Sequence, residues 1–206
     1  NVLNKGREEI KLQDLLLSKN EGYLVSKLPI LKLVDDSNIE IAGAGLIKNG
    51  RIAYQADLRE SGYINLAKGL GTSSRIFIQD ENENKVDYVI KLNKIQQTIE
   101  FLEKNDKPYM ILRIEGAADL EKGLDNVGNS TKSDKDRTKE INIECNKYIR
   151  DQIINLIETI SKEERVDFLN VYRKLYSNKK LWLKYKESQD DFLEDLEYIV
   201  EVNIGI

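Results

Sequence analysis

The chain has 206 residues, of which 40% are hydrophobic and 33% charged, and its net charge is −4. This length allows one large domain or one and a half small ones, and it suffices for an ordinary hydrophobic core. Lysine and arginine are interleaved with acidic residues almost everywhere. Nucleic-acid binding requires a basic face, so we expect no nucleic-acid partner.

The sequence contains no histidine and a single cysteine, Cys145. Histidine is the commonest general base and transition-metal ligand, and one cysteine excludes an internal disulfide and a thiolate metal cage. We therefore expect no catalytic residues, no metal site and no cofactor. The chain starts at Asn1 without a signal sequence or a run of about 18 apolar residues. We expect it to be a piece of a longer protein.

The first predicted elements are a helix over 7–19 and an extended segment over 28–34, where the residue before a proline disfavours helix. A turn follows at 35–38. The clearest signal is a β-hairpin over 39–58, in which strands 39–47 and 51–58 are joined by Asn49-Gly50. These two residues tolerate the positive φ angles that tight hairpins need.

The hairpin runs into Glu60-Ser61-Gly62, which reads as a turn. Ser61 is predicted to cap a short helix over 62–68, and the glycine- and serine-rich stretch 69–74 is predicted to be a connector. We place a domain boundary there. Residues 1–70 would form a smaller α/β unit, part of a truncated upstream domain, and residues 71–206 a C-terminal α+β domain.

Strands are predicted next at 75–79, 86–101 and 109–118, with turns between them. The apolar alternation slips by one residue near Asn93-Lys94, which predicts a β-bulge. The polar stretch 119–137 reads as a mobile loop.

A long helix is predicted over 138–160. Ser161 and Glu164 resemble a capping box that opens a second helix, and Leu181-Trp182-Leu183 lies on a short third one. Residues 198–204 alternate as an edge or closing strand. The whole is an α+β fold, with helices on one face of a mostly antiparallel sheet.

The order of these motifs carries a family resemblance. The hairpin leading into Glu60-Ser61-Gly62 is followed, much later, by Asp167-Phe168-Leu169, by Trp182 and by the strand 197–205. Over about residues 39–206 this order resembles the GerAC-type family, the C subunit of the spore nutrient-germinant receptor. That family usually has glycine after the aspartate triplet, where this chain has Asn170.

The resemblance implies an outward-facing, non-catalytic lipoprotein of the spore inner membrane, tethered by a lipidated cysteine upstream of Asn1. Cys145 is no substitute, because it falls on the apolar stripe of a predicted helix. The resemblance also implies assembly with the membrane-spanning receptor subunits, so that amino acids or sugars trigger ion release and germination. The chain would then be the C-terminal portion of a subunit with additional N-terminal structure.

Glu60, Gly62, Asp167 and Trp182 form the interaction or structural signature. Glu60 reads more readily as a residue that satisfies turn amides, Asp167 as a carboxylate in the first turn of a helix, and Trp182 as a core residue. Each also has an interaction reading: Glu60 as a partner contact, Asp167 as an interaction or ligand-binding carboxylate, and Trp182 as an interface anchor, since tryptophan is enriched in binding hot spots.

Two other functions stay open. The first is a nutrient-sensing domain whose cleft is lined by Trp182 and aromatic strand residues. The second, more remote, is a spore-wall hydrolase using acid pairs such as Asp190-Asp191 or Glu194-Asp195. Such an enzyme needs two carboxyl groups about 5–10 Å apart across a cleft, and with 36 acidic residues such pairs arise by chance.

Overall fold

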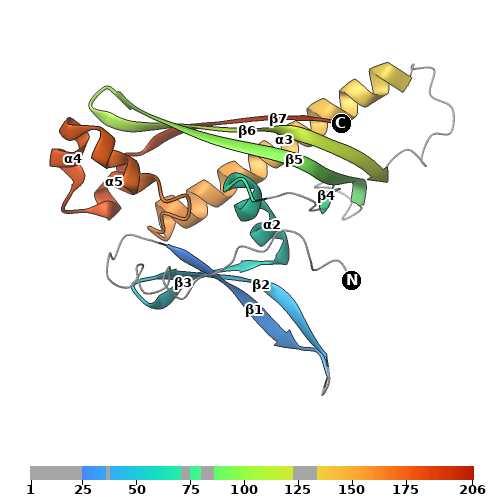
Figure 1. Cartoon of the computed structure of the whole chain (residues 1–206), viewed down its shortest axis with the longest axis horizontal. Coiled ribbons are helices and arrows are strands. Elements are labelled where there is room, and N and C mark those ends of the chain that lie inside the picture. Colours follow the sequence, from blue (N-terminus) through green and yellow to red (C-terminus); the bar gives the residue numbers. More distant parts are fainter. Residues whose placement is uncertain (1–24, 36–37, 71–74, 80–85, 123–133) are drawn as a thin grey trace.

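Two β-sheets, with helices between and beside them, make up the computed structural model of the protein (Figure 1). The structure describes residues 25–35, 38–70, 75–79, 86–122 and 134–206. The predicted helix over 7–19 lies outside these residues, as do the middle of the first predicted turn and most of the connector over 69–74. The predicted α+β class is confirmed.

The first sheet is antiparallel and contains β1 (Ser26–Leu33), β2 (Ile39–Lys48) and β3 (Arg51–Asp57) in that order. The predicted hairpin is confirmed, and its turn has φ angles of 54° at Asn49 and 73° at Gly50. The chain can turn this tightly because asparagine and glycine adopt the left-handed region at low cost.

Helix α2 (Leu58–Ala67) begins four residues earlier than the sequence predicts, so the cap assigned to Ser61 is wrong. Asp57 is the N-cap, and its carboxylate accepts a hydrogen bond from the Glu60 amide while the Glu60 side chain accepts one from the Asp57 amide. This reciprocal capping box satisfies two amides that the helix itself leaves unpaired. Glu60, Ser61 and Gly62 are therefore helical residues, not a turn.

The second sheet has the order β4 (Arg75–Gln79), β5 (Val86–Lys104), β6 (Lys107–Lys122) and β7 (Glu197–Gly205). Its first three strands are antiparallel, and the predicted bulge is confirmed by a register shift between Leu92 and Lys94. Strand β7 is an edge strand, but it pairs with β6 in parallel. A parallel pair needs a long crossover connection, and the helical part of the chain supplies it.

That connection contains α3 (Asp134–Leu156), a π-helical turn η1 (Ile157–Glu163), a 3-10 helix η2 (Val171–Ser177), α4 (Lys179–Tyr185) and α5 (Gln189–Asp195). The polar loop predicted over 119–137 is shorter at both ends, because β6 extends to Lys122 and α3 begins at Asp134. The predicted helix opening at Ser161 is wrong. Ser161 is buried in η1, where its hydroxyl donates to the Val166 carbonyl at 3.2 Å.

The helices cover one face of the second sheet, as predicted (Figure 1). Its covered face is apolar, whereas on the other face Arg113 donates to Glu100 and Glu201 at 2.7 Å each. The core cluster also includes Ile64 and Leu66 of α2. The smaller unit therefore shares buried residues with the larger one across the boundary predicted near residue 70.

Gly43 and Gly45 in β2 give a paired test of this packing. A Cβ at Gly43 would lie 2.1 Å from the Ala56 carbonyl oxygen, whereas at Gly45 the nearest atom, Ile52 Cγ2, would be 3.7 Å away. We expect Gly43→Ala to lower the free energy of unfolding by about 1–3 kcal/mol, the usual cost of overpacking. Gly45→Ala serves as the control: its methyl group would make only ordinary contacts, so it should not lower the free energy of unfolding. Equal effects in chemical denaturation would contradict the close approach at Gly43.

Candidate functional site

Asp167 lies in the irregular stretch between η1 and η2, which we call the Asp167 segment (residues 164–170). Its side chain is 1% exposed. One carboxylate oxygen accepts the Val171 amide at 2.9 Å and the other accepts the Tyr172 amide at 2.7 Å. The carboxylate thus caps the start of η2 from outside the helix, rather than lying in a first helical turn as predicted.

Burial raises the pKa of the Asp167 carboxyl to about 6, although the two amide hydrogen bonds and the charges of Lys48 and Lys68 act in the opposite direction. Desolvation disfavours the charged form, while donors and nearby cations favour it. Asp167 is therefore ionised at neutral pH and becomes protonated in mildly acidic solution.

Asn170 has φ 55° and ψ 38°, which is the left-handed conformation. Glycine adopts this region most readily, and asparagine is among the few other residues that tolerate it. The conformation gives a physical reason for glycine at this position in the family pattern. The Asn170 side chain also accepts the Val25 amide at 3.2 Å, which ties the beginning of β1 to the Asp167 segment.

Lys48 makes a second link between the first sheet and the Asp167 segment. Its ammonium group donates to the Arg165 carbonyl at 2.6 Å and pairs with the Asp190 carboxylate at 3.2 Å. The first sheet is therefore attached to the same segment at the ends of two strands.

At the other signature, Glu60 accepts the Asp57 amide at 2.9 Å and the Tyr54 hydroxyl at 2.8 Å. Burial, followed by the hydrogen bond to Glu60, raises the pKa of Tyr54 to about 12. These contacts agree with the expectation that Glu60 satisfies backbone amides. A contact between Glu60 and a partner protein stays a prediction. Gly62 lies inside α2, and an added Cβ there would meet nothing within 4 Å, so no close approach requires glycine.

Trp182 is half-buried on α4 and packs against the edge of the core. Its ring stacks on Tyr176 with the centroids 4.6 Å apart and the planes at 30°. The Tyr176 side chain is 60% exposed. The structure therefore places Trp182 in an aromatic pair with an exposed tyrosine.

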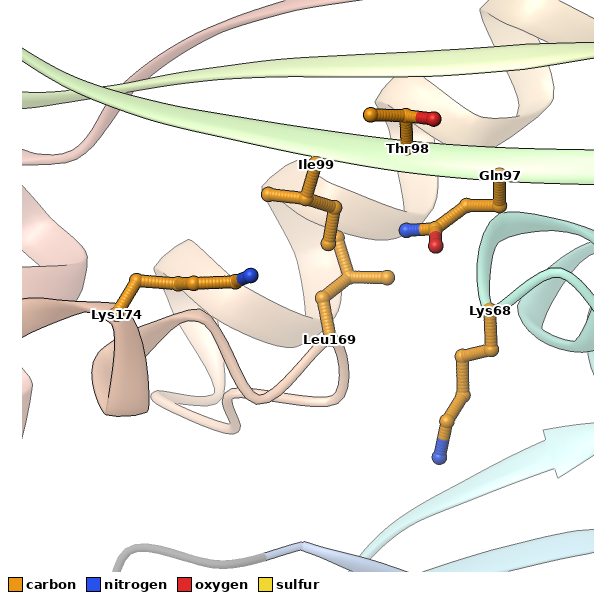
Figure 2. A pocket seen from close by; sticks show the side chains of 6 residues that line it. All are labelled: Lys68, Gln97, Thr98, Ile99, Leu169 and Lys174. Atoms are coloured by element: carbon orange, nitrogen blue, oxygen red, sulfur yellow. The ribbon is translucent and has the colours of Figure 1, made fainter.

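A cavity of about 400 Å³ lies between β5, the end of α2 and the Asp167 segment. Figure 2 shows Lys68 and Lys174 on opposite sides of it, with Ile99 and Leu169 between them. Gln97 and Thr98 complete the lining. The lining thus combines two lysines with two uncharged polar and two aliphatic side chains; Lys174 points toward Ile99 and Leu169, whereas the Lys68 ammonium points away from them (Figure 2). Trp182 does not line this cavity, contrary to the cleft that the sensing hypothesis expects.

Three of the four acidic residues proposed for a hydrolase pair with other side chains of the chain. Asp190 pairs with Lys48, Glu194 accepts Arg165 at 2.9 Å, and Asp195 accepts the Tyr185 hydroxyl at 2.7 Å. Within the described ranges, no three histidine, cysteine or acidic side chains gather as metal ligands would. None of the helices in those ranges has the length and apolarity that crossing a membrane demands.

Asp167 gives a pH-dependent prediction. Because its folded pKa is raised above 3.8, the folded state binds more protons than the unfolded state between that value and about 6. The contribution of Asp167 to stability is therefore largest below about pH 4 and falls by up to about 3 kcal/mol as the pH rises to about 7.

Denaturant unfolding of wild type and Asp167→Asn at both pH values measures this effect. The difference in unfolding free energy, wild type minus variant, should be largest at the acidic pH, because asparagine does not titrate. Other carboxyl groups cancel in this difference. A difference that stays constant with pH would show that the folded pKa is not raised.

Comparisons with known proteins bear on the family resemblance and on the fold. The family described as "Spore germination B3/ GerAC like, C-terminal" matches residues 42–206. The solved structure "Crystal Structure of the GerBC protein" superposes with a TM-score of 0.75 at 15% identity, and covers 100% of this chain. The chain spans 64% of the length of that protein. No curated protein sequence matches it. The resemblance seen in the motifs is confirmed: the chain belongs to the spore germination B3/GerAC-like family.

Proposed function

We propose that the chain is the C-terminal part of a germinant-receptor C subunit and that it acts by docking to other receptor subunits, not by catalysis. Family membership supports the receptor role, and the GerBC-like fold is consistent with it. In this proposal the protein faces outward at the spore inner membrane and is held there by a lipid on an upstream cysteine. The bound partners are the membrane-spanning subunits of the same receptor.

The observation that carries the docking role is an apolar face on the β1–β2 ribbon. Leu31 lies opposite Ile41 and Leu33 opposite Ile39, so all four side chains point to the same side of the ribbon. They are 61%, 38%, 64% and 65% exposed in that order, and the adjacent Val34 is 55% exposed. Figure 1 shows this end of the ribbon extending away from the second sheet and its helices.

A contiguous group of exposed aliphatic side chains is unusual on an ordinary protein surface and marks an interaction site. Among the described strands, β1 is also at the edge of its sheet, and an edge strand can accept a further strand. The aliphatic face is not itself charged, so we infer that a protein surface of matching shape covers it.

The double variant Leu33→Asn/Ile39→Asn tests the docking role. Both side chains are exposed, so the free energy of unfolding should change by less than about 1 kcal/mol. The amides should abolish co-purification of the tagged subunit with the receptor's membrane subunits and slow nutrient-triggered germination. Ile143→Asn is the matched control, because Ile143 is 69% exposed on α3, far from the ribbon in sequence.

Three results would contradict the proposal. One is full co-purification of the double variant. Another is an equal loss in the Ile143→Asn control. The third is normal germination on every nutrient in a strain that lacks this subunit and all other receptors.

A second candidate function, nutrient sensing, is favoured by the cavity between Lys68 and Lys174. Calorimetric titration of the chain with amino acids and sugars tests it. A saturable heat at micromolar to millimolar ligand that Lys174→Gln removes and Lys147→Gln retains would favour a sensor, because Lys147 is exposed and does not line the cavity. Absence of heat with every germinant would leave docking as the function.

A further inference from the structure

The stretch from Val171 to Glu187 has a charge unlike that of the rest of the chain. It contains six cationic side chains and one carboxylate, whereas the whole chain has a net charge of −4. The six cations are Arg173, Lys174, Lys179, Lys180, Lys184 and Lys186, and all of them are exposed. This concentration of positive charge lies on η2 and α4.

Helix α4 has one face in the core and an opposite face that combines lysine with leucine. Leu181 and Tyr185 are buried, at 1% and 2% exposure, and Leu183 is 60% exposed. At about 100° per residue, Leu183 points almost directly away from the core. The same geometry places Lys179, Lys180 and Lys186 around it.

The cations differ in how they are engaged. Lys180 pairs with Glu103 near the end of β5 and with Asp106 on the turn that follows, and Lys184 pairs with Asp195. In contrast, Arg173, Lys174 and Lys179 form no ion pair within the described part of the chain. Their charges are available to an external anion without breaking an internal ion pair; Lys174 also lines the cavity described above.

Aromatic side chains lie beside these cations. Tyr176 is exposed on η2 and stacks on the half-buried Trp182 of α4. Tyrosine and tryptophan favour the headgroup level of a bilayer, where their rings contact acyl chains and their polar atoms contact water. A helix with basic residues around leucine and aromatic side chains is typical of binding at a membrane surface.

We propose that this basic face of η2 and α4 (Arg173, Lys174, Tyr176, Lys179, Trp182 and Leu183) binds directly to an anionic lipid surface. The lysines neutralise lipid headgroups, and Leu183 enters the interface between them. Lysine is depleted in protein–protein interfaces but favours anionic bilayers, so the lysines of this face favour lipid over a protein partner. The face is distinct from the aliphatic ribbon, which has no comparable cluster of cations.

This inference relies on the proposed membrane location, but its test does not involve germination or the receptor. The 206-residue chain, without any lipid modification, is co-sedimented with vesicles of phosphatidylcholine alone or mixed equally with phosphatidylglycerol. We expect binding to the mixed vesicles despite the chain's negative net charge, weakening as salt rises. Binding to phosphatidylcholine alone should be at least tenfold weaker.

Two variants remove the proposed contacts without disturbing internal ion pairs. Arg173→Gln/Lys174→Gln/Lys179→Gln should weaken binding to the mixed vesicles about 100-fold, since each surface cation contributes about 1 kcal/mol. Leu183→Ser should weaken it about tenfold through lost apolar burial. Matched controls are Lys94→Gln/Lys139→Gln/Lys147→Gln, with the same change in charge at exposed sites, and Ile143→Ser. Both controls should bind like wild type.

Three outcomes would overturn the inference. The chain could fail to bind the mixed vesicles, it could bind both lipid compositions equally, or the triple variant could bind like its charge-matched control. If vesicle binding is absent but the triple variant loses co-purification with the receptor subunits, the basic face contacts an acidic protein surface instead. The docking role of the ribbon would survive any of these results.

Discussion

The buried carboxylate of Asp167 is the interaction on which the C-terminal half of the structure depends. It takes up the first two amides of η2, which would otherwise be unpaired in the core. Hydrogen bonds to a charged acceptor are each worth about 1.5–3 kcal/mol, and they offset the cost of burying the charge. The raised pKa indicates that the offset is incomplete. Burial of the Asp167 charge therefore lowers the free energy of unfolding, while its two hydrogen bonds fix the path of the backbone into η2.

The Asp167 segment connects the two surfaces that we propose as contact sites, the β1–β2 ribbon and the basic face of η2 and α4. On one side, Asn170 and Arg165 hold the ends of β1 and β2 through Val25 and Lys48. On the other side, η2 begins directly after Asn170 and leads into α4. The ribbon and the basic face are therefore both connected to this one short segment. A protein partner and a membrane surface can thus be held at a defined orientation to each other.

Patterns between neighbouring residues predicted the strands well. Asn49-Gly50 predicted the hairpin turn, and the apolar slip at Asn93-Lys94 predicted the bulge, because both signals are local. The cap of α2 was missed because Asp57 continues the alternation of β3, while Ser61 is the more familiar capping residue. Ser161 with Glu164 matched a capping box, yet tertiary packing buries Ser161 in a π-helical turn. A short-range pattern does not report that burial.

The sequence singled out Glu60, Gly62, Asp167 and Trp182, but it did not predict what surrounds them. The burial of Asp167 depends on side chains from several elements, and no local signal reports it. The cavity joins Lys68, Gln97 and Lys174, which are far apart in the chain. Helix α5 was missed because its apolar residues, Phe192 and Leu193, are few. The parallel direction of β7 follows from the path of the intervening helices, which strand alternation does not specify.

The parallel edge strand also has a consequence for how the molecule assembles. Strands β4, β5 and β6 can form as a meander through short connections, but β7 reaches β6 only after the whole helical crossover has been made. Closing so long a loop is entropically costly and slow. Until it closes, β6 exposes a full row of backbone hydrogen-bonding groups. In that interval the immature sheet is open to pairing with strands of other chains, so crowding during synthesis would favour its aggregation.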